Sequence, residues 1–224
     1  MDGRSGIFSA PPGLEQSGPV GGSVDPETGF AAEAKRVGIF SGSFNPVHIG
    51  HLALANWLCE YDGTDEIWFL VTPQNPLKET KELMDFRRRF EWVRKAVAGY
   101  PKFRVSDFES TLPRPSYTVR TLRALRASFP DCLFHLIVGA DNWENITQWK
   151  DAEALLAEFP LHIYPRRGYD PILPSPPAQV RMVQAPLLEI SSSFIREALG
   201  QGKDIRFFLP EAIRNEINQL KKMI

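Results

Sequence analysis

Cysteine is scarce in this chain, and its scarcity excludes two classes of protein. Only two of the 224 residues are cysteine, Cys59 and Cys132, and they form no Cys-x-x-Cys pair. A disulfide-stapled secreted domain and a cysteine-rich zinc module both need cysteines that are more numerous and closer together. We therefore expect a protein of the reducing cytoplasm.

Net charge and long apolar runs are lacking as well. The formal net charge at pH 7 is −1, so no overall positive field attracts nucleic acid or an anionic membrane. No apolar run approaches the length that crosses a bilayer. We expect neither nucleic acid nor membrane as a partner, and any attraction for phosphate must come from local groups.

The first 35 residues differ in composition from the rest of the chain. Residues 1–35 are rich in Gly, Ser, Pro and Ala and show no apolar periodicity. They also lack the apolar core of a secretory signal, so we expect a disordered N-terminal extension. Hydrophobic residues make up 43% of the chain, enough for a real core. Residues 36–224 are expected to form one domain.

Within that domain, apolar strand-like runs alternate with helical stretches. This alternation is typical of an α/β fold, and it predicts a Rossmann-like doubly wound parallel sheet with C-terminal helices. Such sheets bind ligands beyond the carboxyl ends of their strands. The expected strands are 36–40, 66–71, 103–106, 133–138, 161–164 and 180–183, and the expected helices lie near 50–61, 85–98, 117–128 and 151–159.

The most informative segment is residues 42–51, which read GSFNPVHIGH. It joins the first strand to a helical pattern over 52–58. Glycine at such a turn lets the backbone approach a phosphate, and the N-terminus of the following helix offers N–H groups to an anion. His48 and His51 lie one helical turn apart, so both can contact the same phosphate. The segment predicts a phosphate-binding turn.

Three other interpretations of the histidine pair compete with this one. A zinc site would need further ligands at recognisable spacing, which the two distant cysteines do not supply. The histidines could instead cap the helix and do no chemistry. Residues 48–51 also spell the signature of class I aminoacyl-tRNA synthetases, but the second, lysine-rich signature of those enzymes is lacking. The glycine, proline and strand context favours phosphate chemistry.

A second candidate phosphate site lies at residues 190–196, which read ISSSFIR. Three serines before an amphipathic helix are typical of a helix N-cap, and a capped helix alone is one interpretation. Exposed N–H groups, serine hydroxyls and Arg196 would also form a phosphate cradle. The pairing with residues 42–51 favours the cradle.

Together these segments resemble the motifs of the HxGH nucleotidyltransferase superfamily. Residues 42–51 are similar to its first signature and residues 190–196 to its ISSxxIR motif, in the same order and roughly a domain apart. Further stretches at 73–78, 116–122 and 139–149 narrow the resemblance to the bacterial nicotinate-nucleotide (nicotinamide-nucleotide) adenylyltransferases. The resemblance covers residues 36–224.

The resemblance implies that the 5′-phosphate of a pyridine mononucleotide attacks the α-phosphorus of ATP in line and expels pyrophosphate, without a covalent intermediate. It implies catalytic roles for His48, His51 and Arg196. The implied ATP-binding residues are Gly42, Ser43, Phe44, His48, His51, Gly139, Asp141, Ile190, Ser191, Ser192, Ser193 and Arg196.

The implied mononucleotide-binding residues are Asn75, Lys78, Thr118 and Trp149. Lys78 would hold the mononucleotide phosphate, the backbone of Thr118 would meet the pyridine carboxylate, and Trp149 would stack on the ring. A solvated loop lysine and a core indole are the alternatives for Lys78 and Trp149. Arg120 replaces an acid that relatives often carry.

The resemblance also implies Mg²⁺ as a companion of ATP, held mainly by nucleotide oxygens and water, with no protein metal site. ATP and nicotinate mononucleotide are the expected substrates, and a homo-oligomer is possible. Nicotinamide mononucleotide, another phosphorylated acceptor, or silent nucleotide binding on the same fold are the alternatives. Phosphopantetheine enzymes typically carry threonine in place of His48, which argues against that acceptor.

Overall fold

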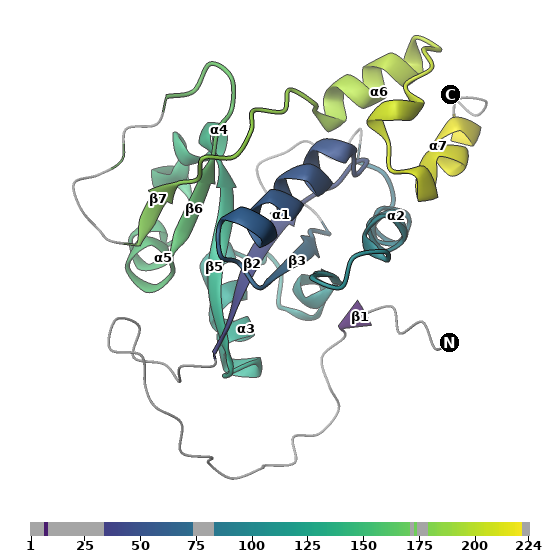
Figure 1. Ribbon diagram of the computed structural model, residues 1–224. Coiled ribbons are helices and arrows are strands. Elements are labelled where there is room, and N and C mark those ends of the chain that lie inside the picture. The colour runs from purple at the N-terminus through teal and green to yellow at the C-terminus, as the bar shows by residue number, and fades with distance from the viewer. Residues whose placement is uncertain (1–6, 9–33, 74–82, 171–172, 174–178, 221–224) are drawn as a thin grey trace.

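The computed structural model describes residues 7–8, 34–73, 83–170, 173 and 179–220 (Figure 1). Of the predicted extension 1–35, the structure describes only 7–8 and 34–35, so disorder there stays a prediction. Among the described helices, none combines the length and apolarity needed to cross a membrane.

Seven parallel strands form one sheet in the order β1-β4-β3-β2-β5-β6-β7. The chain places β2, β3 and β4 side by side in one direction, then returns to pair β5 with the other side of β2. This reversal between β2 and β5 is the switch point of a doubly wound sheet, so the predicted fold class is confirmed. The strands are β1 (Ile7–Phe8), β2 (Lys35–Gly42), β3 (Glu66–Val71), β4 (Phe103–Ser106), β5 (Cys132–Gly139), β6 (Leu161–Tyr164) and β7 (Val180–Met182).

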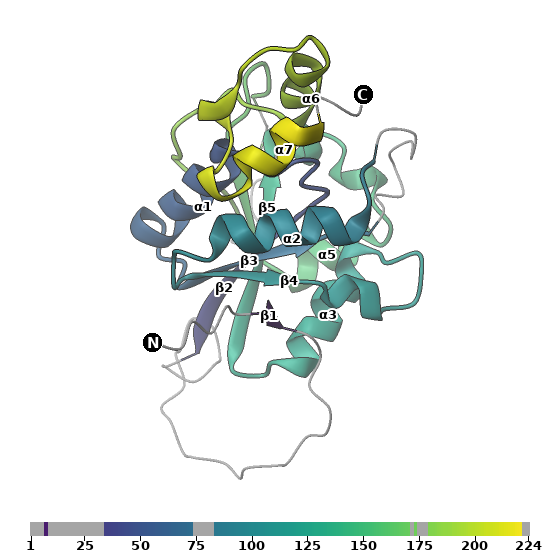
Figure 2. The same cartoon turned by 90° about the vertical axis from the view of Figure 1, so that its right-hand side faces the viewer.

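Helices cover both faces of the sheet. Figure 1 shows α1 crossing the face nearer the viewer, and Figure 2, turned by 90°, shows α1 and α3 on opposite sides of the strands. The helices are α1 (Ile49–Tyr61), α2 (Phe86–Val97), α3 (Thr118–Ser128), α4 (Ala140–Trp143), α5 (Ala152–Glu158), α6 (Ser192–Gly200) and α7 (Arg214–Leu220). Short 3₁₀ turns are η2 (Phe108–Thr111), η3 (Ile146–Gln148), η4 (Arg206–Phe208) and η5 (Glu211–Ile213).

Alternating residues of β2 divide the core into two clusters. Val37 and Ile39 pack with apolar residues of α3, α4 and α5, whereas Phe40 packs with those of α1, α2, α6 and α7. Successive side chains of a strand point to opposite faces, so β2 can serve both clusters at once. The C-terminal helices thus belong to the same layer as α1, and their packing brings α6 next to the turn after β2.

Candidate active site

Two adjoining cavities open near the carboxyl ends of β2, β5 and β6. The histidine cavity, of about 650 Å³, is lined by His48, His51 and Arg196 among others. The tryptophan cavity, of about 480 Å³, is lined by Thr118 and Trp149 among others. The cavities adjoin along a set of residues that line both, so a group held in one cavity lies close to a group held in the other. The shared lining residues are Phe40, Ser41, Gly42, Ser43, Asn142 and Tyr164.

A strained aromatic residue shapes the turn after β2. Phe44 has φ of 45°, which is uncommon for any residue but glycine, and only 2% of its surface is exposed. Its ring packs edge-to-face against Phe40 and His51, with centroid separations of 5.7 and 5.1 Å. The turn therefore fixes the position of His51 as well as the path of the backbone, and such strain is typical of functional sites.

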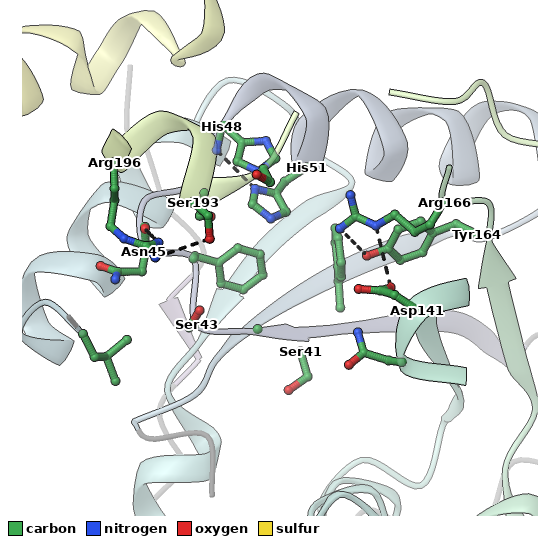
Figure 3. A pocket seen from close by; sticks show the side chains of 17 residues that line it. Ser41, Ser43, Asn45, His48, His51, Asp141, Tyr164, Arg166, Ser193 and Arg196 are labelled. Carbon is green, nitrogen blue, oxygen red and sulfur yellow. Dashed lines mark hydrogen bonds and ion pairs between the residues drawn. The ribbon is translucent and has the colours of Figure 1, made fainter. Parts of the chain in front are cut away.

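His48 and His51 stand at the start of α1 and face the histidine cavity (Figure 3). Their rings are stacked, with centroids 3.6 Å apart. His48 is the N-cap residue, and its backbone N–H donates to Nδ1 of His51 over 3.2 Å. Because Nδ1 accepts this bond, neutral His51 carries its proton on Nε2, where it can be donated to a ligand. The pair therefore caps the helix and offers donors to the cavity.

Both imidazoles are neutral in the unliganded protein. Burial, with the Arg166 charge as a second cause, lowers the pKa of His48 to about 3. Burial and the neighbouring His48 and Arg166 also hold the pKa of His51 well below its usual range. Neutral rings can lie stacked without charge repulsion, and their N–H groups remain hydrogen-bond donors.

The N-terminus of α6 is tied to the turn that precedes α1. Ser191 caps α6 by accepting from the Phe194 backbone N–H over 3.1 Å. Ser192 Oγ donates to the Pro46 carbonyl over 2.9 Å, and Arg196 donates to the Asn45 carbonyl over 3.0 Å. Two helix N-termini, of α1 and α6, are thereby held at one cavity. Helix N-termini attract anions through unpaired N–H groups and the helix dipole.

Arg166 is a cavity residue that the sequence reasoning missed. Figure 3 shows it above Tyr164 and Asp141, and it donates to the Tyr164 hydroxyl over 3.3 Å and faces Asp141 Oδ1 at 3.7 Å. Counting only described residues, Arg166 and Arg196 give the histidine cavity two cations against one carboxylate, in a chain whose net charge is −1. The sequence feature that could have identified Arg166 is its position just after the strand β6, where parallel sheets bind ligands.

Gly139 and Asp141 lie at the end of β5, next to the residues that line both cavities. Gly139 ends β5, and a Cβ added there would lie 2.3 Å from Asp141 Oδ1 and 3.0 Å from the Tyr164 ring. Only glycine therefore leaves room for the Asp141 carboxylate. Asp141 lines the histidine cavity, while Gly139 lines the tryptophan cavity.

The tryptophan cavity brings together two of the predicted mononucleotide residues. Thr118 is the first residue of α3, and the N-cap residue Tyr117 makes no side-chain capping bond. The first N–H groups of α3 are therefore left for a ligand. Trp149 is the C-cap residue that follows η3, is partly exposed, and packs against the core cluster behind it. Both alternatives for Trp149, core and ring contact, fit this half-buried position.

Of the remaining predicted residues, two fall outside the described part of the chain and one, Ile190, lines neither of the two cavities. Asn75 and Lys78 fall in 74–82, outside the described residues. Ile190 lines a smaller hollow behind the histidines, with Gly50 and Arg166. Its Cβ lies 3.4 Å from where a Gly50 Cβ would be, so Ile190 packs against the start of α1.

Most of the buried polar atoms without a hydrogen bond lie around the cleft. Among the described residues, five buried side-chain atoms lack a hydrogen-bond partner. Four of the residues that carry them line the two cavities: His48, Thr72, Asp141 and Arg166. Two of these atoms, Asp141 Oδ1 and Arg166 Nε, face each other at 3.7 Å, which is beyond hydrogen-bond distance. Native proteins rarely leave buried polar atoms without a hydrogen bond, so their gathering here indicates a polar ligand.

A metal ion would find few protein ligands here. In the part of the chain that the structure describes, no group of three or more His, Cys, Asp or Glu could hold one. Asp141 is the one carboxylate among the lining residues of the histidine cavity, and it faces Arg166. A divalent cation at this site would therefore have to take most of its ligands from a bound substrate.

Comparisons with known proteins find relatives of this chain in one family. A family model described as cytidylyltransferase-like matches residues 39–198. A protein of Bacteroides fragilis named as a probable nicotinate-nucleotide adenylyltransferase is 51% identical over 184 residues, which are 82% of this chain and 92% of that protein. A protein of Bacteroides thetaiotaomicron with the same name is 52% identical over 188 residues, 82% and 93% of the two chains.

Solved structures show the same fold. Nicotinic acid mononucleotide adenylyltransferase of Plasmodium falciparum, in complex with NaAD, superposes with a TM-score of 0.67 at 18% identity, covering 83% of this chain and 96% of the other. At this identity the likeness concerns the arrangement of strands and helices.

Proposed function

The chain belongs to the nicotinate-nucleotide adenylyltransferases, and from this membership we propose that its two cavities bind the two substrates of one transfer. The adenylyl group of ATP passes to nicotinate mononucleotide, which gives deamido-NAD and pyrophosphate in NAD biosynthesis. The observation that carries the proposal is the wall of β2 that the cavities share. Two phosphates can meet there.

We assign the histidine cavity to the triphosphate of ATP. His51 offers its Nε2–H, the N-termini of α1 and α6 offer backbone N–H groups, and Arg166 and Arg196 offer charge. These donors are fixed before the substrate arrives, which is how a site stabilises charge that develops in a transition state. Ser193 lies beside Arg196, and its hydroxyl is a further contact in this assignment.

The transfer needs positioning more than it needs a base. The 5′-phosphate of the mononucleotide is already an oxyanion at neutral pH. One of its oxygens forms a bond to the α-phosphorus of ATP. The bond between the α-phosphorus and the oxygen that bridges the α- and β-phosphates breaks. The electron pair leaves with pyrophosphate, where the histidines and arginines meet the growing charge. No proton has to be removed for the bond to form.

We assign the tryptophan cavity to the pyridine mononucleotide. The uncapped N-terminus of α3 favours a carboxylate, because its N–H groups and dipole attract negative charge. This supports nicotinate rather than nicotinamide at Thr118. Trp149 offers an indole face for the pyridine ring.

Mg²⁺ enters this proposal with ATP. Bound to the triphosphate, it would neutralise part of the charge on the leaving pyrophosphate. Asp141 is the carboxylate in the histidine cavity, and its contact with Arg166 makes it a poor candidate for a resident metal ligand.

Pyrophosphate release tests the proposed function. The protein is given ATP and Mg²⁺ with nicotinate mononucleotide, nicotinamide mononucleotide or phosphopantetheine in parallel. We expect strong release with nicotinate mononucleotide. Release with another acceptor alone would keep the mechanism and overturn the substrate, and no release from folded protein that binds ATP would overturn the function.

Trp149→Ala should weaken binding of the mononucleotide. Loss of the stacking surface is expected to raise KM for nicotinate mononucleotide about tenfold while KM for ATP changes little. Steady-state kinetics at saturating ATP measure this. An unchanged KM with a lower melting temperature would mean that the indole serves only the core.

Trp57→Ala is the matched control for that variant. Trp57 lies on α1, stacks on the exposed Tyr61 with centroids 5.9 Å apart, and lines neither cavity. Removing this indole should leave both KM values as they are. A rise in KM for the mononucleotide in this variant would point to a general loss of packing.

A further inference from the structure

Glu109 is a buried carboxyl group in the wall of the tryptophan cavity. It belongs to η2, the turn that follows β4, and only 6% of its surface is exposed. Thr118 and Trp149 line the same cavity. The reaction chemistry described above makes no use of this carboxyl group, although a buried acid beside a substrate carboxylate must affect binding.

One weak hydrogen bond reaches the Glu109 carboxyl group among the contacts of the described residues. Thr121 Oγ1 donates to Glu109 Oε1 over 3.4 Å. No ion pair joins Glu109 to a cation in the described part of the chain. A buried carboxylate without a cation is costly, so the protonated form gains relative to the ionised form. Burial raises the pKa of Glu109 to about 7, and the Thr121 hydroxyl lowers it in part.

Among the described residues, several other titratable groups lie near Glu109. Tyr117, Lys150 and Tyr164 line the same cavity, and Asp107 precedes η2 in the chain. On α3, Arg120 stacks over the Tyr117 ring at 5.2 Å. Strand β3 contacts η2, and Thr72, which follows β3 and lines the same cavity, does not titrate.

We propose that Glu109 is a specificity-determining residue whose protonation state sets the preference between nicotinate and nicotinamide mononucleotide. Protonated Glu109 adds no negative charge to the cavity and can donate to the pyridine carboxylate. Ionised Glu109 repels that carboxylate, and it can accept from the amide of nicotinamide instead. The inference rests on the proposed function and on the assignment of this cavity to the mononucleotide.

The test measures a ratio of specificity constants against pH. The kcat/KM for nicotinate mononucleotide is divided by that for nicotinamide mononucleotide, from pH 6 to pH 8. Both substrates carry the same 5′-phosphate and meet the same ATP and histidines, so those titrations cancel in the ratio. The remaining dependence follows the protonated fraction of Glu109, and we expect the ratio to fall roughly tenfold over this range.

Two variants identify the group responsible. Glu109→Gln keeps the size of the side chain and an oxygen to accept from Thr121, but it does not titrate, so the ratio should become independent of pH. Thr121→Val removes the hydroxyl that stabilises the ionised form, so the fall in the ratio should move to higher pH. A purely structural role for either residue would not move the profile along the pH axis.

The outcomes separate this inference from the proposed function. A flat ratio in the wild type with normal turnover, or the same slope in Glu109→Gln, would overturn the inference alone. If Glu109→Gln does not fold, an unmoved profile in Thr121→Val would overturn it. Lack of turnover with both mononucleotides at every pH would overturn the proposed function, and the inference with it.

Discussion

His51→Ala should lower kcat by about two to three orders of magnitude and leave the fold intact. The expected size is that of removing one fixed donor from a transition state that gains negative charge. The donor in question is Nε2–H, since Nδ1 is occupied by the His48 backbone N–H at 3.2 Å. Single-turnover release of pyrophosphate at saturating substrates measures the loss, and KM should change much less than kcat.

His51→Gln separates catalysis from helix capping. His51 occupies the third position of α1, where Gln commonly accepts from the backbone N–H of the capping residue. Gln should thus keep the melting temperature near that of the wild type, while Ala lowers it. We expect both variants to lose turnover. Because the Gln amide can also donate an N–H, near-normal kcat in the Gln variant would mean that turnover needs the cap and a donor but not an imidazole, whereas near-normal kcat in the Ala variant would remove His51 from catalysis.

The fold could be predicted well from the sequence because its strands are mostly apolar. The expected strands at 66–71, 103–106 and 161–164 coincide with β3, β4 and β6. Strands buried on both faces read as continuous apolar runs. The helices between them are the crossover connections of a parallel sheet, which limits the possible topologies. The two motifs also lie at adjacent helix N-termini, because residues 42–51 and 190–196 each precede a helix that packs on the same face.

The residues that were missed carry their signal in three dimensions. Arg166 follows a strand in a loop rich in proline, and its contact with Asp141 joins two separate segments of the chain. Glu109 lies in an irregular turn, where no period separates buried from exposed residues. Hydrophobic periodicity is informative for elements, and it says little about polar groups that loops bury.

The burial of Arg89 could have been predicted from its position on the helix α2. It is the last of three consecutive arginines, yet it shares the face of Phe86, Val93 and Val97, which point to the core. An arginine on an apolar face must have acceptors inside the protein. The structure supplies four backbone carbonyls, and these belong to the loops that carry both cavities.

Arg89→Met should destabilise the protein by roughly 3 kcal/mol, the scale of breaking a buried hydrogen-bond network. The Arg89 side chain has no exposed surface. It donates to the carbonyls of Met84 at 2.8 Å, Ser43 at 2.6 Å, Thr72 at 2.9 Å and Pro73 at 3.0 Å. Met fills a similar volume and leaves these acceptors without a donor. Urea denaturation gives the change in the free energy of unfolding.

Arg94→Met is the matched control on the same helix. Arg94 pairs with Glu91 at 2.8 Å on the half-exposed side of α2 and lines neither cavity. Exposed pairs contribute about 0–1 kcal/mol, so this variant should remain close to the wild type. Equal stability of the two Met variants would contradict the role given to the buried guanidinium.

Turnover should fall in Arg89→Met even where the variant is fully folded. Ser43 belongs to the wall that both cavities share, and Thr72 lines the tryptophan cavity. A displacement of about 1 Å in such positions can cost about a hundredfold in rate, because both phosphates must be in line. We therefore expect kcat/KM to drop about a hundredfold for both substrates, well below the melting temperature. The ammonium group of Arg89→Lys cannot reach all four carbonyls, so the kcat/KM of this variant should lie between those of the wild type and Arg89→Met. If Arg89→Met lost stability but kept its rate, the hydrogen bonds of Arg89 would support the fold, and other contacts would fix the reaction geometry.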